Sequence, residues 1–188
     1  LLSTALIKAL CWYLDLAYLT GDGVGKPVGV LNDPALITVS RTTSQIITYP
    51  DLCNIFARVA PSCLLNSVWV ANQTCIPQLL TLTVEVGDGG THIPVLTKNN
   101  GQFEILTRPV IFSEKVPARG SKGDIGLYDF SQYVIGMRKE LSIDRSNAVY
   151  WKTSETAYRI IGRVDGQGTW EKPVTPLNGE TVSWCVTL

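Results

Sequence analysis

The pattern of hydrophobic and polar residues shows a long apolar stretch at the start of the chain, residues 1–19. Thr4, Lys8 and Asp15 share a narrow stripe of a helix whose other faces are apolar. Such a helix has to be covered on most sides, so we expect it to be buried. The charges at Lys8 and Asp15, without a basic leading region, argue against a membrane span or a signal peptide. Gly21 stands where a helix commonly ends.

A second, amphipathic helix is predicted after Pro50. From Leu52 to Val59 the apolar residues recur at i, i+3, i+4 and i+7, which is the spacing of one helix face. Proline is favoured in the first turn of a helix and cannot continue one, so we expect this helix to stop before Pro61. Residues 32–49 mix β-branched and polar residues, and predict short strands or an extended loop.

The middle of the chain changes to the period of strands. Residues 67–71 are largely apolar, which is typical of a strand buried on both faces, and a helical turn is expected at 76–80. Polar and apolar residues alternate in 81–86, which predicts a strand. A glycine-rich turn at 87–90 and a partner strand at 91–96 follow, so this part predicts a hairpin.

Short strands separated by turns continue to the end of the chain. They are expected at 103–106, 110–112, 141–144, 158–165 and 182–188. The last one alternates cleanly and predicts a strand with one buried face. Residues 115–124 are rich in glycine and polar residues, and predict a mobile loop. Helices and strands do not alternate regularly, so the predicted fold class is α+β.

Composition places the chain among globular proteins of neutral charge. It has 188 residues, and its 16 Lys and Arg equal its 16 Asp and Glu, which gives a formal net charge of zero. That balance argues against a nucleic-acid-binding module, because such modules usually carry a basic face. A hydrophobic content of 45% excludes disorder. The length predicts one domain, or two lobes, with a substantial core.

The cysteines and the histidine do not form a metal-binding pattern. The five cysteines are Cys11, Cys53, Cys63, Cys75 and Cys185. Their odd number and wide spacing favour reduced thiols over a disulfide framework. Because no C-x-x-C pair occurs and His92 is the only histidine, a zinc site is not expected.

Two glycine-containing segments resemble catalytic loops only in part. A phosphate-binding loop needs glycine five residues before its Gly-Lys pair and a hydroxyl residue after the lysine. In the segment 21–26 these positions are Thr20 and Pro27, so a turn is predicted instead. The segment 120–123 fails as a nucleophile elbow, because Arg119 stands where the elbow needs glycine.

Other arrangements for catalysis are equally weak. A single histidine leaves few ways to build a Ser-His or Cys-His pair. Glu180 and Asp165 are candidates for an acid pair, but their sequence separation does not indicate their distance in space. We therefore predict no catalytic, cofactor-binding or metal-binding residues, and no cofactor.

In the second half of the chain, a group of charged residues and a group of aromatic residues could each lie in more than one environment. Charges of alternating sign at 138–140 and 144–145 favour a solvated face, with a polar interface between subunits as the alternative. Four aromatic residues are expected in the core rather than in a subunit contact. They are Trp151, Tyr158, Trp170 and Trp184.

Two stretches of the chain, taken together, resemble the C-terminal portion of major capsid proteins of tailed bacteriophages or prophages with the Hong Kong 97-type fold. Residues 21–31, GDGVGKPVGVL, are similar to the segment that follows a long helix in that family. Residues 108–110 (RPV), 129–136 (DFSQYVIG) and 163–166 (RVDG) resemble a later series in the same order and at similar spacing.

The resemblance implies a subunit with an axial domain and part of a discontinuous peripheral domain. Residues 1–31 would form the first peripheral segment, a helix and a connector, residues 32–147 the axial domain, and residues 148–188 the C-terminal peripheral strands. The family's N-terminal arm and extended loop lie upstream of these segments, so a C-terminal fragment is expected. Residues 153–156 lack the asparagine used for covalent cross-linking in some members, so no cross-link is expected.

The implied function is that of a structural major capsid protein, which assembles with its own copies into hexamers and pentamers of an icosahedral shell. Catalysis, a membrane and sequence-specific nucleic acid play no part in this function. A scaffold and a maturation protease are further candidate partners. The implied location is the virion, and the bacterial cytoplasm before assembly. The alternatives are a small hydrolase, or a ligand-binding module, with an unrecognised carboxylate site.

Overall fold

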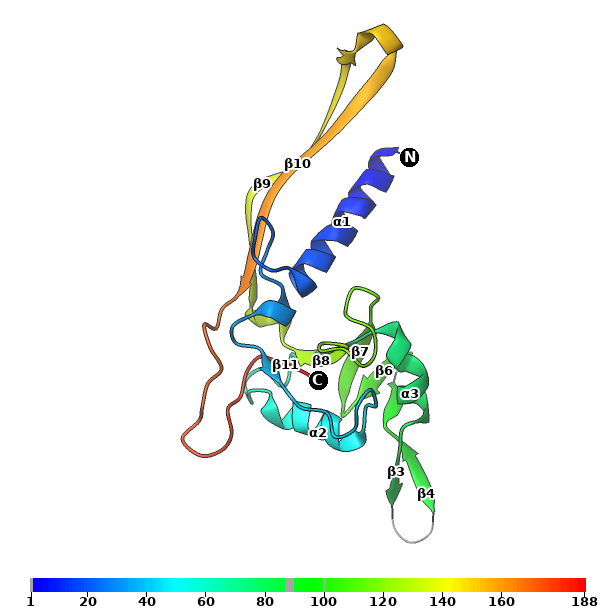
Figure 1. Cartoon of the computed structure of the whole chain (residues 1–188), viewed down its shortest axis with the longest axis vertical. Helices are drawn as coiled ribbons and strands as arrows, with labels where there is room; N and C mark the ends of the chain where they lie inside the picture. Colours follow the sequence, from blue (N-terminus) through cyan, green and yellow to red (C-terminus); the bar gives the residue numbers. More distant parts are fainter. Residues whose placement is uncertain (1, 87–89, 100) are drawn as a thin grey trace.

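The computed structural model describes residues 2–86, 90–99 and 101–188 of the chain. Figure 1 shows an elongated molecule, with a body of sheet and helices from which two hairpins project in opposite directions. The longer hairpin and helix α1 (Leu2–Thr20) extend from one side of the body, and a short hairpin extends from the other.

The body is built on a seven-stranded mixed sheet. Two neighbouring pairs, β1 with β11 and β2 with β7, are parallel, and the other neighbours are antiparallel. In spatial order the strands are β1 (Ile37–Thr38), β11 (Cys185–Thr187), β8 (Ile125–Tyr128), β2 (Val68–Ala71), β7 (Arg108–Phe112), β6 (Gln102–Ile105) and β5 (Leu96–Asn99). The predictions of strands at 67–71, 103–106 and 110–112 are confirmed.

The C-terminal strand is buried on both faces, so the prediction of one exposed face was wrong. β11 lies between β1 and β8 in the sheet, and Ser183 and Thr187 are fully buried. The Ser183 hydroxyl donates to the carbonyl of Ala35 at 2.6 Å, and the Thr187 hydroxyl donates to the carbonyl of Ile125 at 3.0 Å. These bonds satisfy polar groups that the alternating pattern had assigned to solvent.

Helix α2 (Tyr49–Arg58) confirms the second predicted helix. Leu52 and Ile55 on its inner face are fully buried. Thr48 and Asp51 form a capping box at its start. Asp51 is fully buried, and its carboxylate accepts hydrogen bonds from the backbone amides and hydroxyls of both Thr42 and Thr48, at 2.6 to 3.0 Å.

The short projecting hairpin was also predicted. After helix α3 (Ile76–Thr81), strands β3 (Thr83–Val86) and β4 (Thr91–Pro94) pair antiparallel. The expected strand 91–96 is interrupted at Val95, and β5 begins at Leu96 in the main sheet. Of the predicted turn at 87–90, residues 87–89 lie outside the described part of the chain.

Helix α1 is not buried, which corrects the expectation for residues 1–19. None of residues 4–20 is buried, and Tyr13 is 64% exposed. The helix packs through its C-terminal end, where Tyr18 meets Tyr133 edge to face and the Asn32 amide donates to the carbonyls of Thr20 and Gly21. Figure 1 shows its N-terminal part standing apart from the rest of the molecule. No helix in the described ranges is long and apolar enough to span a membrane.

A polar latch, formed by Trp12, Asp15, Glu114 and Lys115, ties α1 to the loop that follows β7. The Trp12 indole donates to the Glu114 carboxylate at 2.9 Å, which holds the pKa of Glu114 below its usual value. Lys115 pairs with Asp15 at 3.2 Å, and its ammonium lies 5.9 Å from the centre of the Trp12 ring. Because these contacts join residues a hundred positions apart, they fix how the helix leaves the body.

The loop 115–124, predicted to be mobile, is irregular but is held to the body. Asp124 is fully buried, pairs with Arg41 and accepts the amide of Gly120 at 2.8 Å. The Asn72 side chain donates to the carbonyl of Val116 at 2.6 Å. The loop is therefore pinned at both ends by buried polar groups.

The long hairpin consists of β9 (Tyr133–Tyr150), the short turn Trp151–Thr153 and β10 (Glu155–Gly168). The boundary expected between residues 147 and 148 falls inside β9. Residues 185–187, expected in the peripheral segment, pair with strands of the expected axial segment. Strand pairing therefore does not follow the expected division at these two places.

Replacing Asp51 by Asn is expected to lower the free energy of unfolding at pH 7 by about 2 kcal/mol, because the amide nitrogen cannot accept bonds and leaves buried donors unpaired. Urea unfolding followed by circular dichroism measures this change. The control is Glu85→Gln, which alters an exposed carboxylate on β3. Equal loss in both variants would contradict the role of the capping box.

The loss in the Asp51 variant should also depend on pH. Burial by itself raises the pKa of Asp51, but the hydrogen bonds from Thr48 and Thr42 outweigh it, and the net pKa is lowered. The folded pKa therefore lies below the unfolded value of about 3.9, and the stabilisation is full above that value and is lost as pH falls through the folded pKa. The difference between wild type and Asp51→Asn should shrink below about pH 4. A constant difference down to low pH would be incompatible with this assignment.

Replacing Lys115 by Met is expected to loosen α1, because the ion pair with Asp15 and the contact with Trp12 are both lost. Exposed ion pairs contribute up to about 1 kcal/mol, so amide hydrogen exchange in α1 should accelerate by up to about fivefold. Hydrogen-exchange mass spectrometry measures it, with Lys98→Met, an exposed lysine on β5, as control. Unchanged exchange in α1 would show that the latch does not hold the helix.

Candidate subunit interface

The long hairpin has no core of its own. β9 and β10 form a separate two-stranded sheet. Gly166, near its base, is the only buried residue in these two strands. Two-stranded ribbons are marginally stable in water unless something packs on them. The hairpin therefore lacks, within the described chain, the cover that such a ribbon needs.

One face of the hairpin is apolar and open. Ile143 lies directly opposite Ile160 in the antiparallel register. Leu141 fills the space above Gly162, where a Cβ atom would collide with it. Tyr158 continues the face two residues from Ile160, and Leu141, Ile143 and Tyr158 are all exposed. Contiguous exposed apolar side chains of this kind usually mark an interaction surface.

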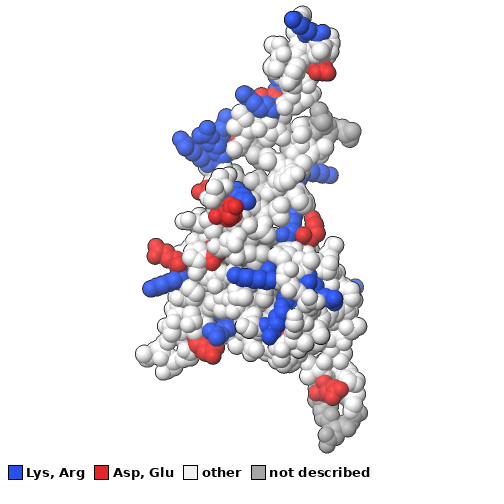
Figure 2. Space-filling view, viewed as in Figure 1, with Lys and Arg blue, Asp and Glu red and all other residues white. Residues whose placement is uncertain are grey.

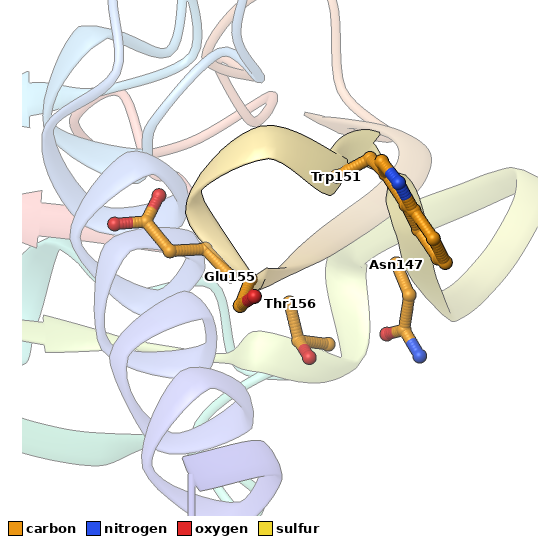
Figure 3. Close-up of a pocket in the computed structure, with 5 residues that line it drawn as sticks. Asn147, Trp151, Glu155 and Thr156 are labelled. Carbon is orange, nitrogen blue, oxygen red and sulfur yellow. The ribbon is translucent and has the colours of Figure 1, made fainter.

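The tip of the hairpin carries the most exposed tryptophan of the chain. Trp151 is 80% exposed. It borders a shallow open hollow of about 390 Å³ (Figure 3), in which Asn147 lies on the same side as the Trp151 ring, with Thr156 nearby, and Glu155 points away. Ser154 adopts the left-handed conformation, with φ 56°, and turns the chain back into β10.

The four late aromatic residues thus divide between core and surface. Trp184 is fully buried, as predicted. Trp170 is half-buried, and its indole donates to the Gln132 side chain at 3.2 Å. The prediction was wrong for Trp151 and Tyr158, because the two-stranded hairpin that carries them has no second layer to receive their rings.

Charged residues on the hairpin are solvent-exposed in this chain. Asp144 and Arg159 lie opposite each other and pair at 2.9 Å. Arg138, Lys139 and Glu140 are exposed. The alternative between a solvated face and a polar interface therefore stays open for these residues.

The base of the hairpin is anchored to the body. The Tyr133 hydroxyl donates to the carbonyl of Val28 at 2.7 Å, and the Val28 amide donates to the carbonyl of Gly166 at 2.9 Å. The Gly168 amide donates to Asp33, where a Cβ atom on residue 168 would collide with the carboxylate. Val28, within the residues 21–31 quoted in the resemblance, and Asp33 just after them therefore hold the hairpin in place.

The buried carboxylates are engaged in structural bonds. Asp33 accepts the amides of Ala35 and Gly168, at 2.8 and 3.1 Å, and burial raises its pKa. Asp129 accepts the amide and the hydroxyl of Ser131, at 3.0 and 2.6 Å. Together with Asp51 and Asp124, described above, these groups brace turns and caps.

Glu180 and Asp165, the acid pair considered from the sequence, are each bonded to a different partner. Glu180 pairs with Arg58 at 2.7 Å, and Asp165 accepts the amide of its neighbour Gly166. His92 lies on β4, opposite Glu85. The segment 21–26 forms the predicted turn. Within it, Lys26 pairs with Asp22 at 3.3 Å.

In the described part of the chain, the cysteines form no disulfide and the usual metal-ligating residues form no metal-binding cluster. None of the five cysteines forms a disulfide, and Cys63, Cys75 and Cys185 are buried. Burial raises the pKa of Cys75 to about 11 and raises that of Cys185 further, which disfavours the reactive thiolates. Within the described ranges, no three His, Cys, Asp or Glu residues are placed to hold a metal ion.

Comparison with known proteins gives a consistent result. The family described as "Phage capsid family" matches residues 1–179. No match is found among curated proteins. Among solved structures, the chain is similar to the capsid of a native GTA particle computed with C5 symmetry, at 15% identity and a TM-score of 0.75 over 99% of this chain and 64% of the other.

Two further structures share the fold. The capsid of an empty GTA particle matches at 16% identity and a TM-score of 0.71, over 89% of this chain and 61% of the other. The holo-SrpI encapsulin complex from Synechococcus elongatus PCC 7942 matches at 16% identity and a TM-score of 0.56, over 89% and 60%. The chain thus spans about three fifths of the length of each of these three chains.

The similarity confirms the predicted α+β fold of Hong Kong 97-type capsid proteins. The exposed hairpin and α1 are therefore seen on a fold that capsid subunits share. Because the family match extends over nearly all of the sequence, the chain belongs to the phage capsid family.

Proposed function

We propose that this protein is a structural subunit of a phage or prophage head, which assembles with its own copies into hexamers and pentamers of an icosahedral shell. The observation that carries the proposal is the apolar surface of the hairpin and of α1, left uncovered on a chain of the phage capsid family. Neighbouring copies, together with the upstream arm and loop that the resemblance implies, would provide the missing cover.

The shape of the molecule supports repeated contacts between copies. The two hairpins project in opposite directions from the body (Figure 1), so one copy presents well-separated surfaces to different neighbours. Such head-to-tail contacts close into rings when the rotation between copies matches the number of subunits. A net charge of zero avoids strong repulsion between packed copies.

We infer a division into two units that follows strand pairing. The peripheral unit would contain α1, the connector to residue 31 and the whole hairpin 133–168. The axial unit would contain the seven-stranded sheet, with α2, α3 and the C-terminal strand. This division keeps the first expected segment, moves the boundary at 147 to the start of β9, and assigns β11 to the axial unit. The reason is that β9 and β10 pair only with each other, whereas β11 pairs with β8 and β1.

The proposed role needs no catalysis. The buried carboxylates are used for capping and bracing, which gives a hydrolase or ligand-binding role nothing to build on. A place in the virion shell, with synthesis in the bacterial cytoplasm beforehand, follows from the proposed role. A scaffold and a maturation protease stay candidate partners for the assembly.

The test is to express this protein from its complete gene and examine the product by electron microscopy and sedimentation. We expect closed particles of uniform size. Only monomers and irregular aggregates, over a range of salt and pH and with the co-expressed neighbouring genes, would contradict the proposal.

The double variant Leu141→Ser with Ile143→Ser should reduce particle yield by at least about tenfold, because side chains at the centre of an interface usually dominate its energy. The melting temperature of the dissociated subunit should stay within about 2 °C of wild type, since neither side chain belongs to the body's core. Normal particle yield would show that this face is not a contact.

A further inference from the structure

The middle of the long hairpin carries a basic cluster of Arg138, Lys139 and Arg163. All three are exposed, and among the described residues none of them is in an ion pair. Figure 2 shows Lys and Arg side chains gathered on one side of the hairpin, below its tip. The cluster is thus a concentration of uncompensated positive charge on a chain whose net charge is zero.

The register of the hairpin brings these charges together. Lys139 lies directly opposite Arg163, and the pairing shifts on both sides of Arg163. The shift between Arg163 and Val164 leaves Arg138 as an extra residue on β9. Such bulges re-aim side chains and are common beside functional sites. Two of the three register shifts of the hairpin therefore coincide with the basic cluster.

The arrangement is unfavourable for the chain by itself. Like charges directly opposite one another destabilise a strand pair. The same hairpin shows the favourable alternative a few residues away, where Asp144 lies opposite Arg159 and pairs with it at 2.9 Å. The opposed Lys139 and Arg163 thus point to a counter-charge supplied from beyond the described residues.

We propose that Arg138, Lys139 and Arg163 form a docking site for carboxylates of a second copy of this chain. This inference rests on the proposed function, because it requires copies to pack side by side. Each copy offers as many carboxylates as cations, and Glu155 and Glu171 are exposed ones without an ion-pair partner in the described chain.

The surroundings of the cluster favour carboxylates over nucleic acid. Glu140 and Asp144 lie within a few residues on the same strand, and both are exposed. A surface that follows a phosphate backbone is basic over a longer stretch. A mixed surface with a local positive centre instead suits the equally mixed surface of another protein copy.

The experiment compares Arg163→Glu with wild type in the protein expressed from its complete gene. Since Arg163→Glu replaces a repulsion with an attraction to Lys139, the dissociated subunit should melt at the same temperature as wild type or higher. Its particle yield should nevertheless fall by about tenfold or more. Lys172→Glu, an exposed lysine outside the hairpin, is the control and should assemble normally. Lys139→Gln, which only removes a charge, is a second variant whose particle yield tests the docking site if Arg163→Glu fails to fold.

The outcomes separate this proposal from the proposed function. Wild-type yield and salt dependence in both Arg163→Glu and Lys139→Gln would overturn the docking site alone. Absence of particles from the wild type would overturn the proposed function and the docking site with it. If both variants assemble normally but lose retention of duplex DNA in a mobility-shift assay, the cluster serves nucleic acid and the proposal is wrong.

Discussion

The hairpin and α1 expose apolar surface that no other described part of the chain covers, and the other features of the molecule follow from this exposure. Ile143, Ile160 and Trp151 belong to a ribbon with no second layer. Apolar surface removed from water contributes about 25 cal/mol per Å², so each of these side chains would stabilise any contact that covers it. A subunit of this kind is adapted to be one part of a larger packed surface.

The body has the opposite character and serves as the rigid base. The buried hydroxyls of Ser183 and Thr187 donate to backbone carbonyls far away along the chain, and the buried Asp124 accepts a backbone amide of its own loop, so these polar groups are satisfied inside the body. A second set of bonds fixes the directions of the projecting elements. Tyr133 and Gly168 tie the hairpin to residues 28 and 33, and the latch at Trp12 ties α1 to the loop after β7. Defined angles between rigid parts are what a closed shell of repeated subunits requires.

Local sequence signals predicted the parts of the fold whose causes are local. Helix α2 was predicted because its apolar spacing, Pro50 and Pro61 lie within a dozen residues. The C-terminal strand was assigned an exposed face because Ser183 and Thr187 are polar, and their partners Ala35 and Ile125 are 148 and 62 residues away. Helix α1 was expected to be buried because its composition demands cover, and composition does not say whether that cover comes from the same chain.

The candidate interface shows the same limit. The resemblance to capsid proteins predicted self-association, but not the residues that carry it. The apolar face and the basic cluster follow from the register between β9 and β10. This register is set by bulges near Arg163, and the alternation of residues along the sequence does not reveal it.

Whether neighbouring copies cover the hairpin can be measured by comparing its hydrogen exchange in dissociated subunits and in intact particles. We expect fast exchange at the apolar face, residues 141–143 and 158–160, in the free subunit, and strong protection there in the particle, with little change in β2 and β8. Equal exchange of the hairpin in both states would show that neighbouring copies do not cover it.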